Sequence, residues 1–436
     1  MKDTEERLDA IAGTSASDVS GWLDVAFQSI LGRLPDPEAR AHYSHTLISG
    51  KQTRRQVLNE MAASTEYRNI EKRRVELLGP YLLKNDLETD GYECIRKLQL
   101  EVTTHCNVDP PCAMCVRTWT KGPPRNMRPE HLSSFRDWLS EDADITLFGQ
   151  GEPFMNPRFW EFVDELHRPG RRIGFSTNGL LMNEAHCRTL VLKKIDWLNI
   201  SMDACTHKTY ARIRGQDFDK LRGNIRRLTG MRTELPPEIC VNMTIMQSNV
   251  HEVTGFCHQA ADLKVDKVLF SPLCPVNSPK KTTPAPDGGT FEYELEAIYQ
   301  STNRSVRTQL ALAEQLCLEL GIAFHYSGDY PHFSSEQVGP APATGARIDC
   351  RAPWSSAWIG LDGSVCFCNY QRGLGPALIL GNIEVGSLGD IMNGSLAASI
   401  RNQILNEPLP DVCQGCPIYE AARCRLVADP ACSAGS

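Results

Sequence analysis

The sequence has no excess of positive charge, no signal-like start and no long apolar run, and each absence removes a class of function. Lys and Arg number 46 against 53 Asp and Glu, a net charge of -7, so no overall positive field exists to hold nucleic acid or an anionic membrane. The first residues lack a positive region followed by an apolar core, and no apolar run reaches the roughly 18 residues that span a membrane. We therefore expect a cytoplasmic protein with no nucleic-acid partner and no membrane partner.

Cysteine, by contrast, is abundant, with 17 residues in a chain of 436. In a reducing compartment, clustered cysteines more often bind metal or carry out redox chemistry than form structural disulfides. An odd number also excludes complete pairing. The rest of the composition, 41% hydrophobic and 23% charged, is that of an ordinary globular protein with room for two to three domains.

Residues 1–78 are expected to form a small all-helical domain. The stretch DVSGWLDVAFQSIL spaces its apolar residues at helical intervals before Gly32, a capping Asp36 with Pro37 begins a second helix, and a third follows Thr53. This pattern resembles a bacterial helical domain family of unknown function, several of whose members are linked with glycans or surface polymers. The resemblance implies a docking or targeting module, and the alternative is an appendage that only packs.

Residues 95–335 alternate between strand-like and helix-like segments. Six short apolar or β-branched runs are separated by helical stretches: KLQLEVT, DITLFG, RIGFSTNG, WLNISMD, ICVNMTI and DKVLFSPL. Strands joined by helices favour a parallel α/β fold, either an open sheet or a partial barrel. In both, ligands collect at the C-terminal ends of the strands, which is where the chemically interesting residues of this chain fall.

Three cysteines follow the first predicted strand directly, in THCNVDPPCAMC. Their spacing, Cx5Cx2C, suits a metal centre on a loop beyond a strand. A structural zinc normally closes with four ligands, and no fourth Cys or His has finger-like spacing, although His105 is a candidate. A four-iron cluster held by three cysteines leaves one iron open to a ligand that is not protein.

On these residues the chain resembles the radical S-adenosylmethionine (SAM) superfamily, whose cluster cysteines follow the first strand of a partial (β/α)6 barrel. The resemblance implies that Cys106, Cys112 and Cys115 hold a 4Fe–4S cluster whose open iron binds SAM. Two features depart from the family pattern. The usual spacing is Cx3Cx2C, and Met114 stands where an aromatic residue commonly precedes the third cysteine.

The resemblance also implies SAM contacts from the ends of later strands: Gly149, Gly151, Glu152, Ser176, Asn178, Ser201 and Arg214. FGQGEP resembles the family's Gly-Gly-Glu motif, in which glycines let the backbone approach the ligand and Glu152 pairs with the SAM ammonium. Ser176, Asn178 and Ser201 would contact the ribose or the amino-acid end, and Arg214 the carboxylate. Each residue also has an ordinary explanation as a turn or cap residue.

Residues 345–436 form a third, cysteine-rich region in which a β-hairpin turning at Leu361 to Gly363 precedes a helical stretch and a CxxC pair. It resembles the C-terminal extension of SPASM and twitch radical SAM enzymes. The resemblance implies one auxiliary 4Fe–4S cluster on Cys350, Cys368, Cys413 and Cys416. Cys366, Cys424 and Cys432 are alternates, a second auxiliary cluster is an open possibility, and a structural zinc on the same four cysteines is the alternative.

The family resemblance implies an enzyme that reductively cleaves SAM to a 5'-deoxyadenosyl radical, which abstracts hydrogen from substrate. A flavodoxin or ferredoxin would supply the electron. We expect a small sugar-like or aminocyclitol-type substrate, undergoing epimerisation or dehydrogenation. The alternatives are radical modification of a peptide or protein side chain, and a non-catalytic iron–sulfur or zinc protein.

Two further cysteines, Cys205 and Cys274, follow strand ends and are candidate hydrogen donors in catalysis, although packing is the competing explanation. Cys187, Cys257 and Cys317 lie within helical patterns, where burial is the better account.

Overall fold

The computed structural model describes residues 8–14, 18–82, 92, 94–119, 123–273, 282–300, 303–327, 352–368 and 376–406. Its central element is a ten-stranded sheet with the order β12-β11-β10-β1-β2-β3-β4-β5-β6-β9. These strands are β1 (Ile95–Glu101), β2 (Leu139–Phe148), β3 (Arg172–Thr177), β4 (Trp197–Ser201), β5 (Glu238–Ile245), β6 (Lys267–Pro272), β9 (Ala323–Tyr326), β10 (Ser356–Ile359), β11 (Ser364–Cys366) and β12 (Gly381–Asn382). A separate pair is formed by β7 (Thr282–Pro284) and β8 (Thr290–Glu292).

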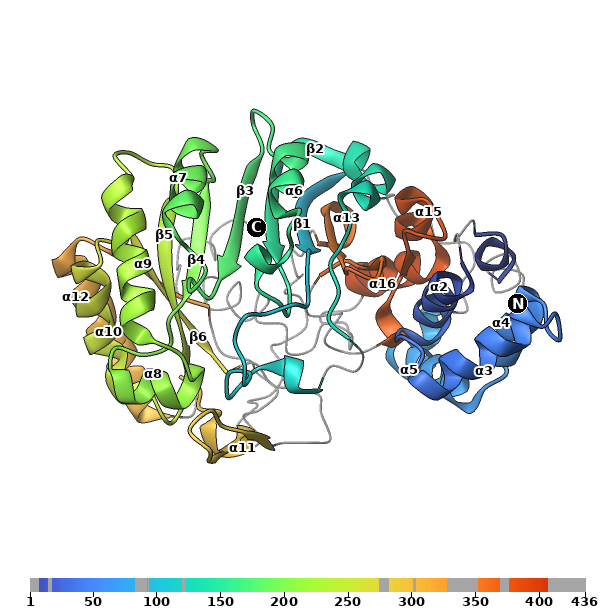
Figure 1. Ribbon diagram of the computed structural model, residues 1–436, viewed down its shortest axis with the longest axis horizontal. Helices are drawn as coiled ribbons and strands as arrows, with labels where there is room; N and C mark the ends of the chain where they lie inside the picture. The colour runs from blue at the N-terminus through green and yellow to red at the C-terminus, as the bar shows by residue number, and fades with distance from the viewer. Residues whose placement is uncertain are drawn as a thin grey trace.

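All six predicted strands are present, and they pair in parallel in chain order from β1 to β6. Helices lie between them, as the alternating pattern predicted: α6 (Phe159–Leu166), α7 (Glu184–Leu192), α8 (His207–Arg214), α9 (Phe218–Met231) and α10 (Val253–Asp262). Two more, α11 (Tyr293–Glu296) and α12 (Arg304–Leu320), lie between β6 and β9. The sheet curves while the larger helices cover one of its faces (Figure 1). The predicted α/β class is confirmed.

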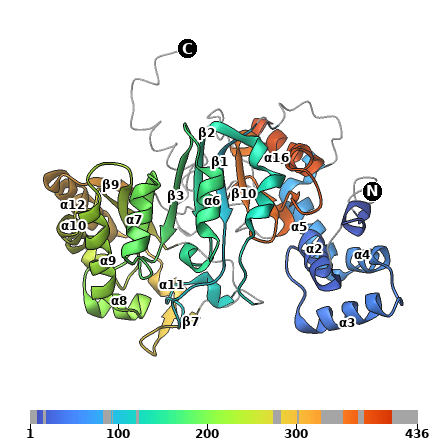
Figure 2. The ribbon, with the colours of Figure 1, turned by 45° about the horizontal axis from the view of Figure 1, so that its top comes forward.

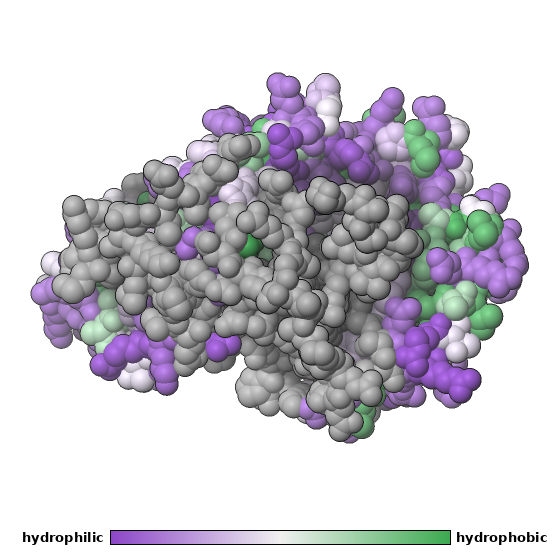
Figure 3. Space-filling view, turned by 180° about the vertical axis from the view of Figure 1, so that it is seen from behind, coloured by the Kyte–Doolittle hydropathy of each residue, from purple (hydrophilic) through white to green (hydrophobic). Residues whose placement is uncertain are grey.

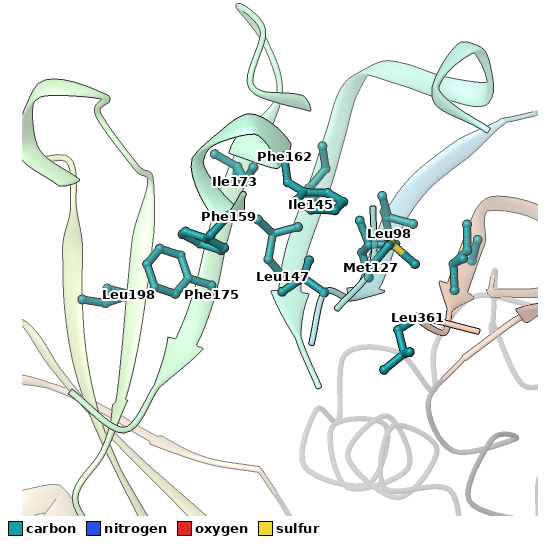
Figure 4. Packing of buried hydrophobic residues seen from close by; sticks show 14 of the residues in the cluster. Leu98, Met127, Ile145, Leu147, Phe159, Phe162, Ile173, Phe175, Leu198 and Leu361 are labelled. Atoms are coloured by element: carbon teal, nitrogen blue, oxygen red, sulfur yellow. The ribbon is translucent and has the colours of Figure 1, made fainter. Parts of the chain in front are cut away.

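The core lies between the sheet and these helices. Ile145 and Leu147 of β2, Phe175 of β3 and Leu198 of β4 alternate with half-buried residues and point to the helical side, where Phe159 of α6 meets them (Figure 4). The period of two along each strand therefore leaves the other side chains on the opposite, concave face.

The N-terminal region is helical, as predicted: α2 (Val19–Leu31), α3 (Pro37–Ile48), α4 (Arg54–Ala62) and α5 (Thr65–Leu82). Asp18, Asp36 and Thr53 cap the first three of these helices through hydrogen bonds from backbone N–H groups. Gly32 adopts a left-handed conformation with φ 66°, which ends α2.

The predicted hairpin is β10–β11, and it joins the main sheet because β10 pairs in parallel with β1. The helices that accompany it are α13 (Ala352–Ser355), α15 (Leu388–Asn393) and α16 (Ser395–Asn406). They lie between the sheet and the N-terminal helices (Figures 1 and 2), and α5 packs on α16. The hairpin thus extends the sheet and brings the N-terminal helices against its edge.

Within the part of the chain that the structure describes, no helix is long and apolar enough to cross a membrane. Hydrophilic side chains make up much of the described surface in the view from behind, and apolar ones gather in small groups (Figure 3).

Candidate metal and cofactor site

The three-cysteine loop lies beyond the C-terminal end of β1 and is fixed along its length by backbone contacts. Thr104 N donates to Arg125 O at 2.9 Å, which pairs the start of the loop with a neighbouring segment. Further on, Ala113 N donates to Ile213 O at 2.9 Å, and Thr283 Oγ1 donates to Ala113 O at 2.5 Å. Three distant parts of the chain therefore hold this loop in place.

Cys106, Cys112 and Cys115 are close enough to influence one another electrostatically. Burial raises the pKa of Cys106 and of Cys115, and the neighbouring Cys112 raises both further. Buried thiols in one another's company resist ionisation, and bound iron cations supply the charge that favours thiolates. The donor set therefore fits an iron–sulfur cluster.

The described residues do not form a site for a single metal ion. Among the described residues, no three His, Cys, Asp or Glu side chains converge as ligands of one metal ion. In a four-iron cluster each thiolate binds a different iron, so its cysteines need not converge on one point. His105, the candidate fourth zinc ligand, is thus not brought into such a set, and the arrangement favours the cluster over structural zinc at this loop.

A first network holds Cys106 from the sides of β2 and β3. Glu152 accepts hydrogen bonds from Thr177 Oγ1 and Asn178 N, both at 2.7 Å. The Asn178 amide in turn donates to Asn107 Oδ1 at 2.8 Å and lies 3.8 Å from Cys106 Sγ. We call Glu152, Thr177 and Asn178 the Glu152 network.

Glu152 is 2% exposed, and burial raises its pKa to about 7 despite the hydrogen bonds from Thr177 and Asn178. Both carboxylate oxygens serve to join the turn after β2 to the end of β3. A contact between Glu152 and the SAM ammonium stays a prediction, to which the structure adds a definite structural role.

Gly149 and Gly151 lie where other parts of the chain leave little room for a side chain. A Cβ on Gly149 would lie 2.5 Å from the Glu101 side chain, and one on Gly151 would lie 2.4 Å from His105 O and 2.5 Å from Thr103 O. Backbone atoms next to the cysteine loop thus exclude any side chain at Gly151. The expected approach of a ligand to these glycines stays a prediction.

We expect Gly151→Ala to lower the free energy of unfolding by about 1–3 kcal/mol, because the added methyl group collides with backbone atoms that cannot move aside. Gly223→Ala is the matched control. Its Cβ meets nothing within 4 Å on the exposed side of α9, so it should stabilise by about 0.5–1 kcal/mol. Urea unfolding followed by circular dichroism measures both, and equal effects of the two changes would contradict the close approach at Gly151.

A second network holds Cys112 from the sides of β4 and β5. Arg214 donates from Nε to Asp203 Oδ2 at 2.6 Å, and its Nη1 lies 3.5 Å from Cys112 Sγ. Asp203 is fully buried and also accepts from Thr244 N at 2.6 Å. Burial alone would lower the pKa of Arg214, but the charge of Asp203, its hydrogen bond and the nearby Cys112 and Tyr210 together outweigh burial and raise the pKa. We call Asp203, Arg214 and Thr244 the Asp203 network.

Asp203 and Arg214 change the interpretation of this segment. The guanidinium of Arg214, the candidate for the SAM carboxylate, is already committed to Asp203 and faces the cysteine loop. Sequence reasoning passed over Asp203, although it stands in the SMD motif. Its φ of 58° lies in the left-handed region, which aspartate tolerates more readily than most residues do.

The remaining predicted positions lie on the concave face. Ser176 is the last residue but one of β3 and Ser201 is the last of β4, and Asn199 donates from Nδ2 to Ser176 Oγ at 3.4 Å. Asn199 Oδ1 is buried and has no hydrogen-bond partner among the described residues. This face therefore offers polar groups to a ligand beside the two networks.

Cys205 lies elsewhere. Its thiol contacts the backbone of the next helical segment: it lies 3.8 Å from Glu252 O, and a Cβ on Gly255 would lie only 2.8 Å from it. Burial and the charge of Glu252 raise the Cys205 pKa to about 12. These contacts are those of a packed thiol, and the hydrogen-donor role stays a prediction. Cys274, the other candidate donor, lies outside the described residues.

The helical cysteines behave as expected for packing, since Cys187, Cys257 and Cys317 are fully buried. Of the predicted auxiliary ligands only Cys368 is described, and it is half-buried just beyond β11. The alternate ligand Cys366 is fully buried, with its thiol 3.7 Å from Leu378 O. Five other cysteines lie outside the described residues: Cys350, Cys413, Cys416, Cys424 and Cys432.

Three family models match the chain: the radical SAM superfamily over residues 100–258, the SPASM iron-sulfur cluster-binding domain over residues 350–417, and DUF4214, a domain of unknown function, over residues 10–70. The first contains both networks and the cysteine loop. The second contains the hairpin, and the third contains α2 to α4.

Similar sequences include the tungsten-containing aldehyde ferredoxin oxidoreductase cofactor-modifying protein of Pyrococcus furiosus, 25% identical over 42% of this chain and 52% of that protein. The mycofactocin maturase MftC of Mycobacterium ulcerans is 29% identical over 27% of this chain and 32% of that protein. The probable GTP 3',8-cyclase of Saccharolobus islandicus is 30% identical over 42% of this chain and 58% of that protein. The matches thus span about a third to rather more than half of these relatives.

Solved structures share the fold. Streptococcus suis SuiB bound to the precursor peptide SuiA has a TM-score of 0.54 and 13% identity, covering 95% of this chain and 91% of that one. The protein anSMEcpe with bound AdoMet and Cp18Cys peptide has a TM-score of 0.50 and 16% identity, covering 76% of this chain and 98% of that one.

Proposed function

We propose, from the premise that this chain is a radical SAM protein with a C-terminal SPASM domain, that it modifies a peptide or protein side chain by radical chemistry. Its radical SAM and SPASM domains bind SAM and 4Fe–4S clusters. The observation that carries the choice of substrate is that two solved structures sharing the fold are described with a bound peptide.

The comparisons do not support the sugar-like substrate that the sequence suggested, nor the epimerase or dehydrogenase class. That expectation depended on the association of the N-terminal helical family with glycans, and the matching family model describes a domain of unknown function. The curated relatives include a maturase, a cofactor-modifying protein and a cyclase, which support radical modification in general and peptide modification among the alternatives.

In this proposal Cys106, Cys112 and Cys115 hold the SAM-binding cluster, while Cys368 joins Cys350, Cys413 and Cys416 at an auxiliary one. When bound, the cluster and SAM together supply a 5'-deoxyadenosyl radical that removes hydrogen from a carbon atom of the substrate. A small reducing protein such as flavodoxin or ferredoxin is the expected electron donor.

The chain's own residues position these groups. The Glu152 network fixes the turn after β2 and the end of β3, with Asn178 directed at Cys106. The Asp203 network directs Arg214 at Cys112. Between them, Ser176, Asn199 and Ser201 leave polar atoms on the concave face, where the unpartnered Asn199 Oδ1 can accept a hydrogen bond from a peptide N–H group.

Anaerobically reconstituted protein with SAM and dithionite should form 5'-deoxyadenosine, measured by liquid chromatography, at a rate that rises when a peptide fraction from bacterial extract is added. Treating that fraction with protease beforehand should remove the stimulation. A rise with the small-molecule fraction that resists protease would instead overturn the peptide proposal.

A further inference from the structure

A cavity of about 230 Å³ lies where the three family-matched segments meet, and none of the three loop cysteines lines it. Helix α2 lines one side of it, the segment 125–131 lines a second, and the hairpin turn together with Glu384 lines a third. We call it the junction cavity. Its size is below the roughly 300–1,000 Å³ of sites for whole small molecules, so it suits a single side chain.

Gln28 of α2 gives the junction cavity a fixed, unused acceptor. The side chain is 4% exposed, and its Nε2 donates to the Asp362 carboxylate at the hairpin turn. Reversing the amide would place two oxygens against each other, so this contact fixes its orientation. The Gln28 Oε1 atom is then buried with no partner in the described part of the chain, which costs free energy unless a donor reaches it.

Glu384 adds a carboxylate without a charged partner in hydrogen-bond contact. Its side chain is 29% exposed, and its nearest basic atom is His131 Nε2 at 3.6 Å. Burial lowers the pKa of His131 and raises that of Glu384. His131 is therefore a neutral ring near pH 7, and its buried Nδ1 has no partner among the described residues.

The charges of the junction cavity favour a cation over an anion. Three carboxylates line it, those of Asp24, Asp362 and Glu384. Of the two guanidinium groups, that of Arg125 is paired with Asp24 at 3.5 Å and that of Arg128 is on an exposed residue, where water can solvate it. In the buried part, three groups have no hydrogen-bond partner among the described residues: Gln28 Oε1, the Glu384 carboxylate and His131 Nδ1. The first two are acceptors of the kind that bind an ammonium or guanidinium.

We propose that the junction cavity binds a lysine or arginine side chain of the peptide substrate, with Glu384 and Gln28 Oε1 receiving its N–H groups. This inference rests on the proposed function for the identity of the ligand as part of a peptide. It gives the N-terminal helical domain a role, since α2 supplies Gln28 and completes a site that the other two segments line only in part.

The full-length chain should bind Nα-acetyl-lysine methylamide or Nα-acetyl-arginine methylamide, measured by saturation-transfer NMR and titration, and should not bind Nα-acetyl-norleucine methylamide. Glu384→Gln, which keeps the shape of the side chain, should weaken this binding at least about tenfold because it removes a partly buried charge partner. Gln28→Leu should weaken it as well. Glu38→Gln removes the same charge from an exposed position on α3 and should leave the affinity unchanged.

Equal binding of the norleucine compound, or equal affinity of the Glu384→Gln and Glu38→Gln proteins, would overturn the cation site. Preferential binding of Nα-acetyl-glutamate methylamide would show an anion site instead and would equally overturn it. The two proposals fail separately. Lysine binding that depends on Glu384, without any peptide stimulation of SAM cleavage, would contradict the peptide function alone. Peptide stimulation that is the same in the wild-type and Glu384→Gln proteins would contradict the junction-cavity site alone.

Discussion

Cys112→Ala is expected to abolish 5'-deoxyadenosine formation and to lower the iron content of the reconstituted protein from about eight to about four atoms per chain, if each of two clusters holds four. Cys112 is 8% exposed, and its charge raises the pKa of both Cys106 and Cys115. Removing one of three thiolates leaves two protein ligands, and metal binding depends on the complete set.

The matched control is Cys187→Ala, which removes a fully buried thiol from α7 on the helical side of the sheet. It should keep the iron and the SAM cleavage of the wild-type protein, at a modest cost in stability. Iron determination and electron paramagnetic resonance of the reduced proteins measure the outcome without a substrate. Retention of both properties by Cys112→Ala, or equal iron loss in both variants, would contradict the assignment of the cluster to this loop.

The strands and caps were predictable because their causes are local. Leu98 and Leu100 alternate with more exposed neighbours along β1, and Asp36 precedes Pro37 at the start of α3, so a short window of sequence determines each outcome. The position of the three cysteines beyond a strand end followed from the same pattern, and the radical SAM identification rested on it.

What could not be predicted depends on contacts between distant segments. Nothing in the hairpin sequence states that β10 pairs with β1, some 260 residues earlier in the chain, because any exposed strand edge offers the same backbone groups. The sequence around Gly151 likewise did not indicate that the carbonyls of Thr103 and His105 lie against this glycine. The function of a buried residue such as Asp203 likewise depends on Arg214 and Thr244, which come from other elements.

Breaking the Asp203–Arg214 pair is expected to lower the free energy of unfolding by about 3–5 kcal/mol, since Asp203→Asn leaves the Arg214 charge buried without its counter-charge. The side chain of Arg214 is only 13% exposed, so water cannot replace the lost partner. Arg188–Glu184, an ion pair on α7 with about two thirds of each side chain exposed, is the control. There Glu184→Gln should cost no more than about 0.5 kcal/mol.

Because the two buried groups act on each other, their effects should not add. Arg214→Gln alone leaves the Asp203 carboxylate buried without its counter-charge. The double variant Asp203→Asn with Arg214→Gln has two neutral amides that can hydrogen-bond. Its loss of unfolding free energy should therefore be smaller than the sum of the two single losses by about 1–3 kcal/mol. Urea unfolding of iron-free protein isolates this pair from cluster binding. Additive effects, or a cost of Asp203→Asn no larger than that of Glu184→Gln, would contradict the buried pair. Non-additivity would show that the ion pair beside Cys112 forms in the iron-free chain.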